Sequence, residues 1–129
     1  MDDKQRHTSR YLTPYFIEQA LKSGKAVGQF LGWFEHNGQN AIRYLLIYQG
    51  QQKFLLCVQE HYDQGTKESY GDIGEYTLIN EDKLIKYVFS TLEETLQFAS
   101  SNYGARPDRW VNESMINDEY TDAFSARPR

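Results

Sequence analysis

The sequence predicts an α+β domain in which helices pack on one face of an antiparallel sheet, a meander of about four or five strands. Three runs rich in aromatic and β-branched residues follow one another closely, at Val27–His36, Ala41–Gln49 and Lys53–Tyr62. Their connections are too short for the crossovers that parallel strands need, so neighbouring strands run antiparallel. Helical patterns before and after these runs supply the α component.

The first helix and the strand turns are predicted from end signals. Thr13-Pro14 is typical of a helix start, because Thr is a good N-cap and Pro suits the first helical position. Gly24 is typical of a helix end. Asn37-Gly38 favours a tight hairpin turn, and residues 50–52 form the next short connection.

Two features inside the strands bear on packing. Gly28 and Gly32 lie four residues apart in the first run, where they indicate a bulge or a close backbone approach. The run Ala41–Gln49 is apolar on both of its faces, which is typical of a central strand that is covered on both sides.

The second half of the chain is predicted to begin with an irregular segment, to continue with a short strand and to end in two helices. Residues 63–82 are interrupted by glycines and indicate one broken strand or a loop that leads into a strand. Residues 84–89 indicate a short strand. Ser90 or Thr91, with Glu93 or Glu94 three residues later, predicts a capped helix that ends at Gly104. A last, shorter helix is predicted over 112–124.

Length and composition fit one domain at 11–124, between disordered tails at 1–10 and 125–129. No apolar run reaches the length of a membrane span, and the first ten residues have no hydrophobic centre of a secretory signal. We therefore expect a cytoplasmic protein without membrane contact. The single cysteine, Cys57, lies in an apolar run and is expected to be a buried, inert thiol.

Acidic residues gather in two segments. Residues 60–82 hold seven carboxylates and one lysine, and residues 108–122 hold five carboxylates and one arginine. The net charge of −4 argues against nucleic-acid binding, which depends on cations that neutralise phosphates. A solvated surface explains such clusters, and so does a surface for a basic protein partner. On the second interpretation, the candidate partner-binding residues are Glu60, Asp63, Glu68, Tyr70, Asp72, Glu75, Tyr76, Asp118 and Glu119.

No motif in the sequence indicates a catalytic, metal or cofactor site. The three histidines lack the spacing of a metal-binding pair, and the glycines match no phosphate-binding or dinucleotide-binding loop. His61, beside Glu60 and Asp63, is expected to be solvent-exposed near a strand end, although an acid–base role is conceivable for it. We therefore expect no enzyme activity and no cofactor.

The C-terminal third resembles bacterial immunity proteins of contact-dependent growth inhibition and related polymorphic toxin systems. The resemblance rests on the strand Tyr87-Val88-Phe89, the helix start at 91–96, the Asn-Tyr-Gly turn at 102–104, Trp110-Val111-Asn112 and Asp118-Glu119-Tyr120. It implies a small cytoplasmic protein that binds one cognate toxin domain, often a nuclease, and blocks it. Nuclease domains are often basic because they attract phosphate, so we expect an acidic surface of this chain to block the active site. The resemblance carries no map of contact residues.

Two alternatives to an inhibitor stay open from the sequence. One is a small enzyme or ligand-binding domain with a pocket near His61, walled by Trp33 and Tyr44. The other is a structural or adaptor subunit that forms homo-oligomers through an exposed sheet edge or face. For the inhibitor, we expect a monomer or a weak dimer.

Overall fold

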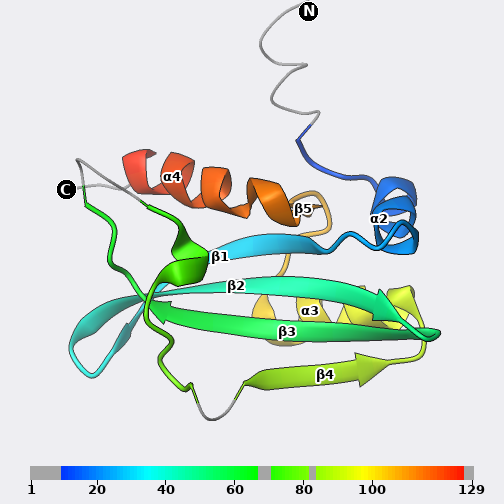
Figure 1. Ribbon diagram of the computed structural model, residues 1–129, viewed down its shortest axis with the longest axis horizontal. Coiled ribbons are helices and arrows are strands. Elements are labelled where there is room, and N and C mark those ends of the chain that lie inside the picture. The colour runs from blue at the N-terminus through cyan, green and yellow to red at the C-terminus, as the bar shows by residue number, and fades with distance from the viewer. Residues whose placement is uncertain (1–9, 67–70, 82–83, 127–129) are drawn as a thin grey trace, which may run out of the picture.

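The computed structural model describes residues 10–66, 71–81 and 84–126. Within these residues, three α-helices accompany a five-stranded antiparallel sheet of order β4-β3-β2-β1-β5 (Figure 1). The α+β class and the antiparallel meander are thereby confirmed. In chain order the elements are α2 (Pro14–Lys22), β1 (Val27–His36), β2 (Gln39–Gly50), β3 (Lys53–Tyr62), the short 3₁₀ helix η1 (Ile73–Glu75), β4 (Ile85–Phe89), α3 (Leu92–Tyr103), β5 (Val111–Asn112), the 3₁₀ helix η2 (Glu113–Met115) and α4 (Ile116–Ala126).

The turns between the long strands depend on left-handed backbone conformations. Asn37 and Gly38 have φ angles of 52° and 78°, as the tight turn between β1 and β2 requires. Gln51 and Gln52 adopt φ angles of 46° and 65° between β2 and β3, although neither is glycine. The ladder between β2 and β3 is uninterrupted, with Ala41 opposite Tyr62 at one end and Gly50 opposite Lys53 at the other.

The two glycines of β1 have separate roles, and both predicted roles are confirmed. A Cβ atom on Gly28 would lie 2.6 Å from the backbone oxygen of Leu45 and 2.7 Å from Cδ1 of Ile116, so this position allows close packing of α4 on the sheet. Gly32 has a φ of 110°, and the register between β1 and β2 shifts between Phe30 and Gly32, which is a bulge.

The helices cover both faces of the sheet, which corrects the expectation that they pack on one. Ile17 and Leu21 of α2 and Ala99 of α3 pack with Leu45 and Ile47, on what we call the α3 face. Ile116, Tyr120 and Phe124 of α4 pack with Ile42, Tyr44 and Leu46, on the opposite α4 face. Figure 1 shows α4 along β1 and α3 behind β2 and β3. The physical reason is that β2 is apolar on both faces, so a layer on each side is needed to bury it.

The C-terminal segment differs from the prediction in its boundaries. Thr91 caps α3 through the backbone N–H of Glu94, and Gly104, with a φ of 72°, ends it. Instead of one helix over 112–124, the chain forms β5, then η2, then α4, which continues to Ala126 beyond the expected boundary at 124. β5 pairs with β1 at Val27 and Gly28, a contact that no local pattern indicates.

Candidate functional site

The carboxylates of residues 60–82 do not share one surface. Glu60 lies on the α3 face, where its Oε2 atom accepts hydrogen bonds from Nε of Arg43 at 2.7 Å and Nη2 at 2.6 Å. Successive strand residues point to opposite faces, so Glu60 and His61 lie on different sides of the sheet. Glu60 is therefore committed to a partner inside the chain.

Asp63 joins three segments of the chain. Its Oδ2 atom accepts a hydrogen bond from Nε1 of Trp33 at 2.6 Å, and its Oδ1 atom accepts from the hydroxyl of Tyr120 at 2.6 Å and the backbone of Gly65 at 3.0 Å. Burial and the bond to Asp63 raise the pKa of Tyr120. Tyr76 is only 8% exposed and packs edge-on against Tyr120, at 5.9 Å between ring centroids. Asp63 and Tyr76 therefore stabilise the fold through contacts with other residues of the chain.

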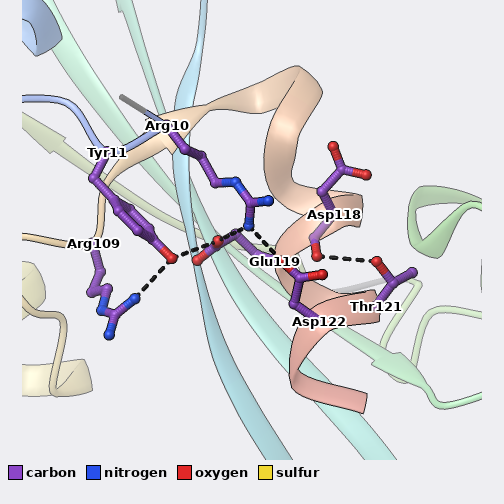
Figure 2. Close-up of polar contacts among 7 residues, drawn as sticks. All are labelled: Arg10, Tyr11, Arg109, Asp118, Glu119, Thr121 and Asp122. Carbon is purple, nitrogen blue, oxygen red and sulfur yellow. Dashed lines mark hydrogen bonds and ion pairs between the residues drawn. The ribbon is translucent and has the colours of Figure 1, made fainter. Parts of the chain in front are cut away.

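Glu119 belongs to a network that ties the start of the described chain to α4 (Figure 2). Its Oε2 atom accepts hydrogen bonds from Nη1 of Arg10 at 2.7 Å and from the hydroxyl of Tyr11 at 2.8 Å. Arg10 also pairs with Asp122 at 2.8 Å, and these two acids raise its pKa. Arg109 donates to the Tyr11 hydroxyl at 2.7 Å and stacks on its ring. Arg10 is therefore anchored, although residue 10 was expected to lie in a tail.

The remaining predicted residues fall into two groups. Glu68 and Tyr70 lie outside the described residues. The side chains of Asp72, Glu75 and Asp118 are exposed, and none of them forms an ion pair with a residue that the structure describes. Asp72 caps η1 by accepting from the backbone N–H of Gly74 at 2.9 Å.

A hollow of about 520 Å³ lies between this capped turn, β2 and the start of α4. Asn117 fixes its shape, because its side chain accepts from the N–H of Ile73 at 2.9 Å and donates to the carbonyl of Gly71 at 3.0 Å. The lining residues are Tyr44, Leu46, Asp72, Ile73, Gly74, Glu113, Ser114, Ile116 and Asn117. Glu113 was not among the predicted partner-binding residues, although it belongs to the acidic segment 108–122.

A second hollow of about 360 Å³ adjoins the first, since both are lined by Glu113 and Ser114. It extends along β2 to Tyr48 and to residues 24–26. We call the two hollows together the acidic trough. Its floor is formed by the residues of β2 that face α4, namely Tyr44, Leu46 and Tyr48. The Tyr48 hydroxyl lies 3.5 Å from Oε2 of Glu113.

Beyond the trough, the α4 face is open over the outer strands. Tyr48 of β2 pairs with Leu55 of β3, which pairs with Val88 of β4, so these three residues form a row across the sheet. Tyr48 is 36% exposed and Val88 is 64% exposed. We call this row the apolar row. The next row contains Leu46, Cys57 and Lys86, and Cys57 is buried as expected.

His61 is buried, so the expectation of a solvent-exposed histidine is wrong. Its ring is 2% exposed, stacks on Tyr44 and has Nδ1 at 2.8 Å from the carbonyl of Tyr76. The segment around Leu78 folds back and forms a β-bridge with His61. Burial lowers the pKa of His61. Its ring lines neither hollow of the acidic trough.

With this geometry in place, comparison with protein families, curated proteins and solved structures gives no match to the chain. No helix in the described part of the chain is long and apolar enough to cross a membrane. Among the described residues, no three His, Cys, Asp or Glu side chains are grouped as a metal site would need. The candidate site therefore consists of the acidic trough and the apolar row beside it. The charge and the apolar character of these residues indicate which kind of partner the site can bind.

Proposed function

We propose that this chain is an immunity-type inhibitor, which binds a cognate toxin domain in the cytoplasm and blocks its active site. The observation that carries the proposal is the juxtaposition of the apolar row with the acidic trough. Tight interfaces concentrate their energy in aromatic and aliphatic anchors within a polar surround. Tyr48 lines the trough together with Glu113, and the exposed Val88 lies in the same row across the sheet as Tyr48.

The charge of this surface favours a basic partner. Asp72 and Glu113 line the trough, and neither forms an ion pair with a residue that the structure describes. A carboxylate without an internal cation gains more from an external one than a carboxylate that is already paired, such as Glu60. Nuclease domains attract phosphate with lysine and arginine, so a nuclease toxin supplies the complementary surface.

Rescue of growth tests this proposal. The gene next to this one, if it encodes a large protein with a toxic C-terminal domain, supplies the toxin. We expect co-expression of this chain to restore growth of cells that produce that domain, and the purified proteins to form a one-to-one complex whose affinity falls with added salt. Growth arrest that persists despite a folded, well-expressed inhibitor would contradict the proposal.

Charge reversal locates the interface. The double variant Asp72→Lys/Glu75→Lys is expected to weaken toxin binding at least tenfold and to flatten its salt dependence. Glu93→Lys/Asp108→Lys changes the net charge equally at two exposed carboxylates on α3 and in the turn before β5, so it is the matched control. Equal losses of affinity in both variants would show a general charge effect rather than a defined surface. Mass measurement in solution tests the expected monomer or weak dimer.

A further inference from the structure

We propose that the acidic trough binds an extended segment of a partner protein and holds one cationic side chain, arginine or lysine, between Asp72 and Glu113. This inference rests on the proposed function, because it names the chemistry by which the toxin is recognised. It also specifies where the charged side chain of the bound segment lies, namely at the Asp72 end of the trough.

The length of the trough fits a short extended segment. Its floor runs along β2 from Tyr44 to Tyr48, a rise of about 13 Å at about 3.3 Å per residue. An extended segment that lies alongside β2 places about four residues over this floor. Tyr44 and Leu46 are buried and firmly packed, so the floor is preformed and its ordering adds little to the cost of binding.

The electrostatics of the trough favour a cation at one end. The hollow that contains Asp72 is lined by two carboxylates and no cationic residue, whereas Lys25 lines the other hollow. The pKa of Tyr44 is raised, mainly by the burial of its side chain and in smaller part by the negative charges of Asp72 and Glu113. Both carboxylates therefore act electrostatically on the same tyrosine. A guanidinium suits the site because it donates several hydrogen bonds and stacks on aromatic rings.

The N-terminus of α4 also faces the trough, and its dipole would favour an anion. That dipole corresponds to about half an elementary charge, and the Glu113 carboxylate at the helix start opposes it with a full charge. The second carboxylate, Asp72, leaves the hollow negative in sum. The balance therefore selects a cation, and an anionic peptide is excluded from this end.

Short peptides test the inference without knowledge of the toxin. We would titrate ¹⁵N-labelled protein with the peptide acetyl-Gly-Arg-Ala-Ala-amide and follow backbone amide shifts. The control peptide carries citrulline, a neutral isostere, in place of arginine. We expect saturable shifts confined to residues 44–48, 72–74 and 113–117, and at least fivefold weaker binding of the citrulline peptide.

Two variants of equal charge separate the trough from a general acidic surface. Asp72→Asn/Glu113→Gln is expected to weaken the arginine peptide at least fivefold, while Glu93→Gln/Asp108→Asn leaves its dissociation constant within twofold of the parent value. The amide spectra report at once whether each variant is folded. Shifts scattered over the surface, equal binding of the citrulline peptide, or a loss of affinity in both variants would overturn the inference.

The two proposals fail in distinguishable ways. If the chain rescues growth but the arginine peptide does not bind the trough, the inhibitor function stands and the cation site is refuted. If the peptide binds the trough but the chain does not neutralise the toxin, the site stands as a recognition site for basic segments and the toxin is not its target.

Discussion

Replacement of Asp63 by alanine should destabilise the fold severely, although Asp63 lies in the acidic segment that sequence reasoning assigned to partner binding. Its carboxylate accepts short hydrogen bonds from Trp33 and Tyr120, both 2.6 Å long, and a third from the backbone of Gly65. Bonds to a charged group contribute about 1.5–3 kcal/mol each, so loss of the two short ones costs roughly 3–6 kcal/mol. That is a large part of the roughly 5–15 kcal/mol that stabilises an ordinary domain.

Thermal unfolding measures this loss. For 129 residues, an unfolding entropy of about 2.1 cal/mol/K per residue converts 3–6 kcal/mol into a fall in Tm of about 10–20 °C. Glu75→Ala is the matched control, because its side chain is exposed and forms no hydrogen bond among the described residues, and its Tm should stay within about 2 °C. An Asp63→Ala variant that melts within about 3 °C of the parent protein would refute the structural role of this carboxylate.

Three further predictions concern packing, pH and the N-terminal network. Gly28→Ala should lose about 1–3 kcal/mol in urea unfolding, because its Cβ would lie 2.6 Å from a backbone oxygen; an unchanged midpoint would contradict the close approach. Burial lowers the pKa of His61 below 6.5, so the unfolded chain takes up the proton first. Stability should therefore fall as the pH drops below about 6.5, by up to about 1.4 kcal/mol per unit, and level off at the folded pKa; His61→Gln should remove this slope from the pH series. Glu119→Gln should cost about 1 kcal/mol and speed amide exchange at Leu12, whose N–H bonds to Trp110; exchange as slow as in the parent protein would argue against an anchoring role.

Local signals in the sequence were sufficient for most of the sheet. The bounds predicted for Val27–His36 and Lys53–Tyr62 are those of β1 and β3, because turn residues and β-branched runs are determined by nearby residues. The roles of Gly28 and Gly32 were also predictable, since glycine within a strand has few structural uses. In contrast, β5 is two residues long and exists through its pairing with β1, so nothing in its own sequence indicates it.

Long-range packing explains the predictions that failed. His61 looked exposed because it stands near the end of a polar-flanked strand. In the fold its ring stacks on Tyr44 and contacts the carbonyl of Tyr76, and residues 77–79 return to pair with 60–62. One signal was available: His61 has the same strand parity as Leu55 and Cys57, which lie on the face packed by α4. The arrangement of helices on both faces was likewise indicated by the two apolar faces of β2, more strongly than by any property of the helices themselves.

The candidate site shows why a sum of charges along the chain is a poor guide to a surface. Three of the acidic side chains have partners inside the fold: Glu60 pairs with Arg43, Glu119 pairs with Arg10, and Asp63 accepts a hydrogen bond from Trp33. These carboxylates therefore stabilise the fold and are less suited to bind a partner protein. Each of these three partners is distant in sequence, and pairing of this kind follows only from the tertiary structure.

Two of the carboxylates without an internal cation, Asp72 and Glu113, have a common location that the sequence order conceals. Asp72 and Glu113 are 41 positions apart, yet both line one hollow, because Asn117 binds the backbone at Gly71 and Ile73 and draws the turn against α4. A scan of acidic residues should therefore separate into two classes. Substitutions of Glu60, Asp63 and Glu119 act through stability, whereas substitutions of Asp72 and Glu113 act on binding in a protein that remains folded, so measurement of both quantities on the same variants distinguishes a recognition site from its scaffold.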